Sequence, residues 1–562
     1  MRQGYAECQM GRKKQSKGLV SPSSMVCDSQ EEARGGRGER ERARESWECT
    51  MVGEARWEQE TISEKMEDGR IKWFIAATGG LLRLLSRAYR CGAIDHPLIV
   101  ASPFRWDRYT CTQPLFVLPP PTDTHATRRR AKEGLFLLQH GLSPYSGDAF
   151  KGSPAMLLVA MLDQLGGPLL VPLLFAFLEI GIGALILQQC DAVIRSAERF
   201  EPVAASAEMT PAETIPDETS RMVENLHTIP RPGPSSTARK SNSLSLIVLG
   251  LYMLNPVLVA EGASFSSQTL ARFVLMLGFN AAQRGSIVCT AAAISLHWLW
   301  FDLSAVSLVV PVTLMLHQSK TTASQWMGAE QDELLDVKKR YHHVQFPFGL
   351  FMQLLGLMVF WSMIWLVCGA AISRDLLPGS LSFLAAAAKL QIGHSDLAPN
   401  VGTSWYLFQQ VFPRFRGYFS VLWTFHPWIY VIPCTIRIGM FPEALTHLLA
   451  SIFLMCGPYP TFCDLSLVMC LLLPHTKVLA YLNWKIMSFV VVAIWIPTLV
   501  MPVVLEQWLV AGTGNANFVY FQGLGFNVFV SLALVQFMAG AVKRRKAIMT
   551  AVKLRYPVPQ ED

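Results

Sequence analysis

Apolar runs alternate with polar connectors along most of this chain. The longest, such as 347–371, 484–505 and 518–541, hold few charges, and a helix that crosses a bilayer needs about 20 apolar residues. Counting the shorter runs as well, the pattern predicts an all-α, polytopic transmembrane helical bundle of about 12 spans. These spans are expected at 71–90, 168–187, 244–260, 268–283, 286–301, 303–318, 347–371, 417–436, 441–457, 464–480, 484–505 and 518–541.

Two runs leave alternatives open. Arg83 and Arg87 interrupt the run 71–90, which could instead lie flat on the membrane as an amphipathic helix. The run 155–165 is short and ends at a Gly-Gly-Pro sequence, so it could dip into the bilayer without crossing. If it does cross, the N-terminal end changes sides.

Charge in the connectors sets the expected orientation. Lys543, Arg544, Arg545 and Lys546 follow the last run, and the positive-inside rule places such clusters in the cytosol. The turn between the last two runs then lies on the opposite side. The expected organisation is a disordered tail at 1–70, a membrane domain at 71–546 with lumenal loops 91–154 and 372–416 and cytosolic loops 190–243 and 319–346, and a cytosolic C-terminal tail at 547–562.

Composition agrees with a membrane protein. The chain is 51% hydrophobic and 16% charged, whereas a soluble domain carries about 25% charged residues. The net charge of +7 reflects basic residues in the connecting loops, so it does not indicate a nucleic-acid partner. The cysteines show no C-x-x-C pair, so neither a metal site nor a disulfide framework is expected. Glu179, inside the run 168–187, is costly in lipid and is expected to face protein.

No catalytic signature is found. The chain has no G-x-S-x-G, H-E-x-x-H or P-loop pattern. Enzymes that use lipid-linked sugars usually pair acidic residues in the first outer loop, but the acidic residues there stand without an Asp-x-Asp, at Asp95, Asp107, Asp123 and Asp148. Three histidines near the ends of runs are expected to be satisfied interfacial groups, namely His297, His426 and His475. No catalytic residue, metal or cofactor is predicted.

Three polar features fall on the outer side: the stretch 396–406, with Trp405 and Tyr406 as aromatic residues of the membrane interface, the hairpin turn 457–464, and the turn 511–517. Asn side chains both donate and accept hydrogen bonds, and the backbone N–H groups of a Gly-rich turn suit phosphates. Together the three features could line a polar mouth for a lipid with a polar head. The alternative is that they only cap helices and turn the chain.

Five segments in order carry a family resemblance: EGLFLLQHGLSPYSG (133–147), LYMLNPVLVA (251–260), DLAPNVGTSWYLFQQVF (396–412), YPTFCDLSLVMCLLLP (459–474) and GNANFVYFQGLGFNVF (514–529). They resemble the class U subunits (PIG-U) of the glycosylphosphatidylinositol (GPI) transamidase complex. The tail 1–70, an apparent insertion at 106–131 and the long loop 190–243 depart from the family pattern.

The resemblance implies a non-catalytic, multi-pass subunit in the endoplasmic reticulum membrane, with a fold similar to GT-C mannosyltransferases. Its expected partners are a caspase-like catalytic subunit, the membrane and lumenal scaffold subunits, membrane lipids and the GPI lipid itself. In the family, the Asn-x-Asn turn before the last span is associated with contact to GPI. The resemblance therefore implies such a contact for Asn515 and Asn517. The resemblance also implies GPI-lipid binding by Asp396, Asn400, Tyr459 and Asp464, and Pro399 and Pro460 match family motifs as well. A lipid-linked-sugar mannosyltransferase of the GPI pathway is the alternative function, and a transporter is disfavoured because no inverted repeat is seen.

Overall fold

The structure is a computed structural model, and it describes residues 70–82, 128–147, 150–198, 234–255, 258, 267–326, 346–374, 382–395, 397, 399–457, 459–509 and 511–555. The chain divides into two units, 1–69 and 70–562. The predicted tail therefore lies outside the described residues except for its last position. Throughout the described ranges the regular structure is helical and no strand occurs, which confirms the all-α prediction for unit 70–562.

Helices cover most of each described range. In the first half they are residues 70–82, α4 (Arg128–Gln139), α5 (Pro154–Leu165), α6 (Gly167–Glu198), α9 (Pro234–Met253), α11 (Ser267–Gln283), α12 (Ile287–Trp300), the 3₁₀ helix η4 (Leu303–Leu308) and α13 (Val309–Trp326). In the second half they are α15 (Phe348–Ser373), α16 (Ser382–Gln391), α17 (Ser404–Gln410), α18 (Pro413–Phe425), η5 (His426–Tyr430), α19 (Val431–Ile438), α20 (Pro442–Cys456), α21 (Phe462–Leu472), α22 (Thr476–Leu479), α23 (Trp484–Leu509) and α24 (Ala516–Arg555).

Five helical segments within the described residues are long and apolar enough to cross a membrane: Leu169–Ala197, Phe348–Ser373, Pro413–Ile438, Trp484–Leu509 and Ala516–Thr550. Several other apolar helices are only 10–17 residues long, among them α12 and α20. The membrane nature of the protein follows from these segments, while the count of about 12 spans stays a prediction, because a helix shorter than about 17 residues does not cross the hydrocarbon core alone.

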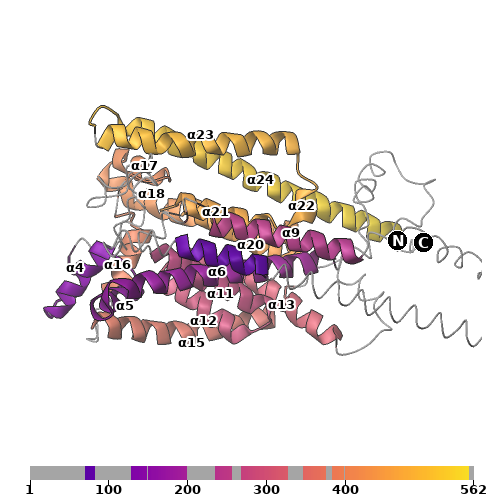
Figure 1. Ribbon diagram of the computed structural model, residues 1–562, viewed down its shortest axis with the longest axis horizontal. Helices are drawn as coiled ribbons and strands as arrows, with labels where there is room; N and C mark the ends of the chain where they lie inside the picture. Colours follow the sequence, from indigo (N-terminus) through magenta and orange to yellow (C-terminus); the bar gives the residue numbers. More distant parts are fainter. Residues whose placement is uncertain are drawn as a thin grey trace, which may run out of the picture. The chain divides into compact units, whose positions relative to one another are not determined.

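The long helices of unit 70–562 run side by side, with α20 and α21 among them (Figure 1). Helix α20 is buried along nearly its whole length, and the main core cluster extends from it to α11, α13 and α24. By contrast, only 17% of the best apolar window of α15 is buried. An apolar face of that size is stable against lipid rather than water, so α15 presents a membrane-facing or partner-facing surface.

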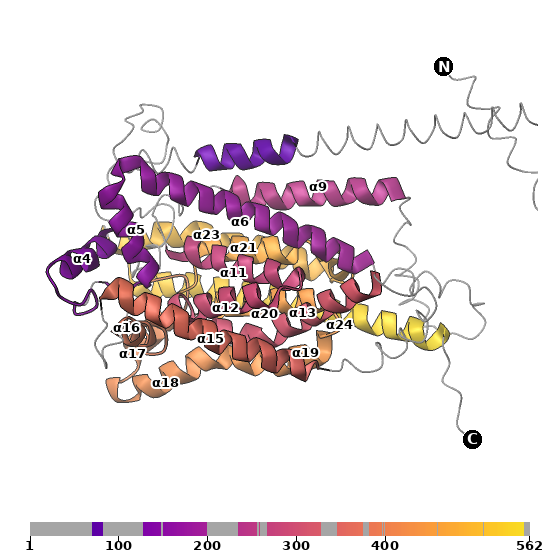
Figure 2. The same cartoon turned by 90° about the horizontal axis from the view of Figure 1, so that it is seen from below.

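Short helices gather at one end of this bundle. Both views place α4, α5, α16 and α17 there (Figures 1 and 2). The turn between α23 and α24 lies at the same end (Figure 1), and the basic residues of α24 that follow Val542 lie toward the other end. The parts of the predicted outer side that the structure describes thus come together.

Some predicted connectors are partly helical. Helix α6 continues past the expected end of its span to Glu198, and α9 begins at Pro234, so helix occupies both ends of the loop 190–243. The loop 372–416 likewise contains α16 and α17. Hydropathy marks where a chain leaves the apolar layer, but Gln, Ala, Arg and Glu continue a helix into water at little cost.

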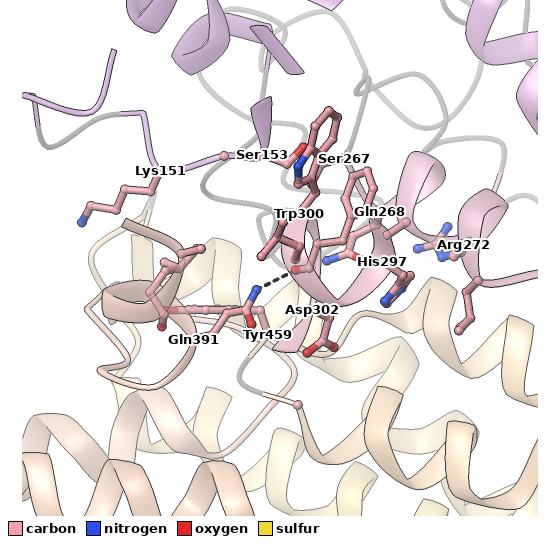
Figure 3. Close-up of a pocket in the computed structure, with 18 of the residues that line it drawn as sticks. Lys151, Ser153, Ser267, Gln268, Arg272, His297, Trp300, Asp302, Gln391 and Tyr459 are labelled. Atoms are coloured by element: carbon pink, nitrogen blue, oxygen red, sulfur yellow. Dashed lines mark hydrogen bonds between the residues drawn. The ribbon is translucent and has the colours of Figure 1, made fainter. Parts of the chain in front are cut away.

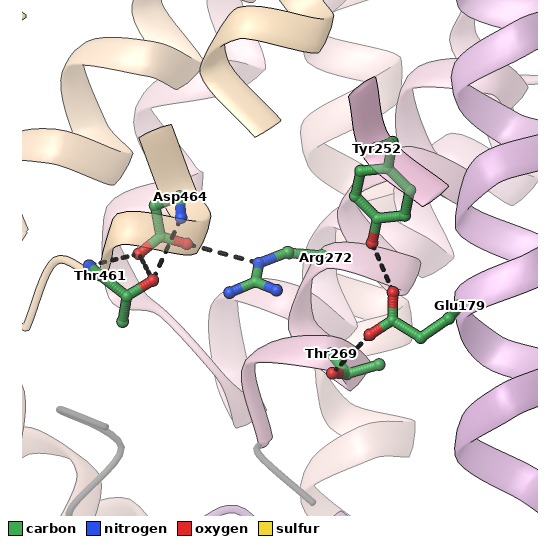
Figure 4. Close-up of polar contacts among 6 residues, drawn as sticks. All are labelled: Glu179, Tyr252, Thr269, Arg272, Thr461 and Asp464. Carbon is green, nitrogen blue, oxygen red and sulfur yellow. Dashed lines mark hydrogen bonds and ion pairs between the residues drawn. The ribbon is translucent and has the colours of Figure 1, made fainter. Parts of the chain in front are cut away.

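Glu179 faces protein, as its position inside an apolar run predicts. It is 1% exposed and accepts hydrogen bonds from the Tyr252 hydroxyl at 2.8 Å and from Thr269 Oγ1 at 3.0 Å (Figure 4). These contacts join α6 to α9 and α11. A buried carboxylate with two donors is much less costly than an isolated one, and here it holds three helices together.

Candidate functional site

The turn between α23 and α24 is built by helix capping. Beyond Leu509, the backbone N–H of Ala511 donates to Glu506 O at 3.2 Å, and those of Thr513 and Gly514 donate to Gln507 O at 3.0 and 3.1 Å. Gly512 has a φ of 66°, a left-handed conformation that glycine adopts without a steric penalty and that commonly ends a helix. The sequence pattern Gly-Thr-Gly therefore closes α23.

Asn515 begins the next helix. Its Oδ1 accepts from the Asn517 backbone N–H at 3.1 Å, the bond expected of an N-terminal cap. The expectation that N–H groups of this turn bind phosphates is therefore wrong for residues 511, 513, 514 and 517, because their N–H groups already donate within the chain. The Asn515 and Asn517 side chains themselves are exposed, so their amide NH₂ groups remain as donors for a ligand.

Asn517 is tied to the stretch 396–406. The Tyr406 hydroxyl donates to Asn517 Oδ1, and the Tyr406 ring stacks on Tyr520 with centroids 4.5 Å apart. Beside this pair, Trp405 stacks on Trp508 at 6.1 Å. The prediction that Trp405 belongs to an interfacial belt is wrong: it is 1% exposed, because it fills the space between α17 and α23.

Asn400 shapes this stretch from inside. Its side chain is 1% exposed, its Oδ1 accepts from the Gly402 N–H at 2.7 Å, and its backbone carbonyl accepts from Trp405 Nε1 at 3.1 Å. The next carbonyl, of Val401, accepts from Asn527 Nδ2 of α24 at 2.9 Å. Asn400 therefore positions the segment rather than forming its surface. The other predicted residue of this stretch, Asp396, lies outside the described residues.

The hairpin turn between α20 and α21 is a capping box. The Asp464 N–H donates to Thr461 Oγ1 at 3.1 Å, and the Thr461 N–H donates to Asp464 Oδ2 at 2.8 Å, the reciprocal pair that starts α21. Pro460 adjoins the previous segment, since a Cβ added to Gly402 would stand 3.0 Å from Pro460 Cδ. All three outer features therefore pack against one another, although Gly402, Pro460 and Thr461 are themselves buried.

Sequence reasoning missed Arg272. This α11 residue is 1% exposed, and its Nε lies 3.4 Å from Asp464 Oδ1 (Figure 4). A lone arginine inside the apolar run 268–283 was the available signal, since an ionisable residue in such a run needs a partner inside the protein. The ion pair ties α11 to the hairpin.

A cavity that is partly open to solvent lies behind the hairpin (Figure 3). Tyr459 and Asp464 line it, as do Arg272, Asp302 and His297. Asp302 Oδ1 accepts from the Ser304 N–H at 2.8 Å, so both carboxylates already have protein donors. The part of the chain that the structure describes holds no cluster of three or more His, Cys, Asp or Glu suited to a metal ion; Asp95, Asp107, Asp123 and Asp148 lie outside it.

The histidines differ from one another. His426 Nδ1 lies 2.6 Å from the Trp423 carbonyl, in agreement with a satisfied group. His475 is buried rather than interfacial, and its Nε2 lies 2.9 Å from His447 Nδ1. His297 contradicts the prediction, because its Nδ1 is buried without a hydrogen-bond partner. His297 instead lines the cavity behind the hairpin.

His394 is a further buried histidine beside the site, in the connection between α16 and α17. It is 3% exposed and has a φ of 44°, and its Nε2 lies 3.2 Å from Thr424 Oγ1. Burial lowers the pKa of His394 to about 4. The ring is therefore neutral near pH 7 and braces α17 against α18.

Comparison with known proteins gives the family. The profile of the family described as "GPI transamidase subunit PIG-U" matches residues 122–526. The chain belongs to this family. It is 24% identical over 410 residues to the GPI transamidase component GAB1 homolog of Schizosaccharomyces pombe, covering 73% of this chain and 83% of that protein.

A human protein, the GPI-anchor transamidase component PIGU, is also 24% identical, over 417 residues that make up 74% of this chain and 85% of that relative. The resemblance expected from the five sequence segments is thereby confirmed, as is the role of a GPI transamidase subunit. None of these names supports the mannosyltransferase alternative. The matched range also starts well after the tail 1–70.

Proposed function

We propose that this chain is a non-catalytic subunit of the GPI transamidase complex in the endoplasmic reticulum membrane, and that it helps to bind and present the GPI lipid. A GT-C-like membrane domain of about 12 spans would hold it in the bilayer, and a caspase-like partner subunit would carry out the transamidation. One observation supports the proposal: three separate segments meet beside the exposed turn, since Tyr406 donates to Asn517 and Gly402 approaches Pro460.

The chemistry of the exposed turn and of α24 beside it suits an amphiphile. The Asn515 and Asn517 side chains are exposed, and their amide NH₂ groups can donate to phosphate oxygens or sugar hydroxyls. Further along α24, a broadly open hollow of about 590 Å³ is lined by Leu524, Val528, Leu532 and other residues. A polar head held at the turn would place its acyl chains along this hollow, because apolar walls favour lipid tails.

A double variant tests the proposal. Asn515→Ala with Asn517→Ala removes both amides, and at about 1 kcal/mol per hydrogen bond we expect surface display of GPI-anchored proteins to fall severalfold. Protein level and recovery of the other transamidase subunits in mild detergent should stay normal. Asn483→Ala is the matched control, since Asn483 is an exposed Asn directly before α23, at its other end. Normal anchoring in the double variant would mean that the two residues only cap α24.

A further inference from the structure

The cavity behind the hairpin contains polar atoms that the protein leaves unused. His297, near the C-terminal end of α12, is only 6% exposed. Its Nδ1 is buried and has no hydrogen-bond partner. Ser153 Oγ, just before α5, is a second such atom. Both residues line the same cavity (Figure 3). A buried polar atom without a partner costs about 1–3 kcal/mol, so a hydrogen-bonding occupant would stabilise both elements.

The charges around the cavity are balanced. Arg272 and Lys151 line it together with Asp302 and Asp464, and the Arg272 guanidinium is already paired with Asp464. No excess of positive charge remains to attract a phosphate, which arginine clusters or helix N-termini usually bind. No excess of negative charge remains for an ammonium group either. The balance favours a neutral occupant with several hydroxyl groups.

Aromatic and apolar side chains form the remaining walls, among them Trp300, Phe383 and Tyr459. Trp300 donates its Nε1–H to the Trp365 carbonyl at 3.1 Å, so its polar edge is used and its ring contributes apolar surface. Gln391 braces the wall, since its Nε2 donates to Phe301 O at 2.6 Å (Figure 3). Its Oε1 accepts from the Leu303 N–H at 2.7 Å. The walls therefore offer apolar ring surface beside the two unused polar atoms.

We propose that this cavity binds one neutral sugar unit of a glycolipid, with Ser153 Oγ and His297 Nδ1 bonding its hydroxyls and the aromatic walls covering its apolar ring face. The inference rests on the proposed function, because a glycolipid would bring a sugar to this end of the bundle. Tyr459 and Asp464 are buried hairpin residues that line the cavity, and the hairpin packs against the stretch that contacts Asn517. The head of one ligand could thus contact the exposed turn while a sugar enters the cavity.

Binding can be measured on the full chain in phospholipid nanodiscs, together with the subunits that accompany it. Saturation-transfer NMR with methyl hexopyranosides reports sugar contact directly, and inorganic phosphate and ethanolamine serve as competitors. Ala387→Trp fills the cavity from α16, and Ala385→Trp is its control, because Ala385 is exposed on the same helix and does not line the cavity. Ser153→Ala removes one donor, with Ser146→Ala in the exposed preceding loop as its control.

We expect saturation transfer to the hexoside in the unmodified chain, its loss in Ala387→Trp, and affinity about three- to tenfold weaker in Ser153→Ala, as one hydrogen bond implies. Both controls should bind normally, and excess phosphate or ethanolamine should not compete. Absence of transfer, which would mean that water alone fills the cavity, overturns the proposal, as does equal transfer in Ala387→Trp or displacement by either competitor.

The Asn515→Ala, Asn517→Ala variant separates this inference from the proposed function. It should retain hexoside binding while its anchoring activity falls. If anchoring depends on the two Asn residues but no hexoside binds, only the sugar cavity is overturned. If the hexoside binds and anchoring is normal in that variant, the proposed role of the Asn turn is overturned instead.

Discussion

The hydroxyl of Tyr406 donates a hydrogen bond to Oδ1 of Asn517, a residue 111 positions further along the chain. This bond occupies the amide oxygen and leaves the amide NH₂ group as the donor available at the surface. The neighbouring Asn515 uses its own oxygen to cap α24. Both amides are therefore held with their oxygens turned to the protein, an arrangement that presents donors rather than acceptors to a ligand.

Tyr406→Phe should separate positioning from packing. The variant keeps the ring that stacks on Tyr520 and loses only the hydroxyl, at a cost of about 1 kcal/mol in stability. With the Asn517 amide no longer oriented, we expect surface display of GPI-anchored proteins to fall about two- to fivefold at unchanged protein level, as measured by flow cytometry. Unchanged display would show that the orientation of this amide has no role in anchoring.

Two glycines of α24 make a matched pair. A Cβ on Gly523 would stand 2.9 Å from the Val401 carbonyl oxygen, whereas nothing lies within 4 Å of one on Gly525. Gly523→Ala should therefore push the 400–402 segment away and destabilise the protein by about 1–3 kcal/mol. Gly525→Ala should be neutral or stabilising by up to about 1 kcal/mol, because alanine favours the helix. Thermal unfolding followed by fluorescence-detected size exclusion compares the two, and equal midpoints would contradict the packing.

Substitution of Arg272 or Asp464, which form a buried ion pair, should destabilise the protein far more than substitution of an exposed charged residue. Arg272→Met leaves a buried carboxylate without its cation, which costs about 3–5 kcal/mol. Replacing both residues, Arg272→Met with Asp464→Asn, should recover part of that loss because no unpaired charge remains. Arg414→Met, at an exposed position of α18, is the control. If the single variant at Arg272 were as stable as the Arg414 control, the ion pair would contribute nothing.

The burial of His394 should make the stability of the protein depend on pH. An unperturbed histidine has a pKa of about 6.5, whereas burial lowers that of His394 to about 4. Between these values the unfolded chain binds a proton that the folded chain does not, so stability falls as the pH drops, by about 2 kcal/mol from pH 7 to pH 5. Asn tolerates the left-handed backbone, and His394→Asn should flatten this dependence. The difference between the two melting curves across that pH range is the measurement.

Sequence reasoning was accurate where a single residue stands out from its run. Glu179 was expected to face protein because a carboxylate inside an apolar run has no other stable environment, and Arg272 obeys the same rule although it was overlooked. Charge in the connectors also grouped the three polar outer features on one side. The direct contacts between these features could not be predicted, because a close approach such as that of Gly402 to Pro460 leaves no periodic pattern in the sequence.

The errors have a common physical origin. Trp405 was assigned to the membrane interface from residue type, although its burial depends on Trp508, a partner more than one hundred residues away. The backbone N–H groups near Gly512 were expected to be open to a ligand, but helix capping uses them. In both places composition predicted the chemistry correctly, while the three-dimensional neighbour decided which atoms remain available.

The bond from Asn527 to the Val401 carbonyl has a consequence for biosynthesis. During translation, residues 399–410 leave the ribosome before α24 is made, so Val401 lacks its partner on α24 until that helix has been inserted. Truncation before α24 would therefore remove a contact of a segment that lies more than one hundred residues earlier in the chain. Helix α24 thus completes the packing of a segment that lies more than one hundred residues before it.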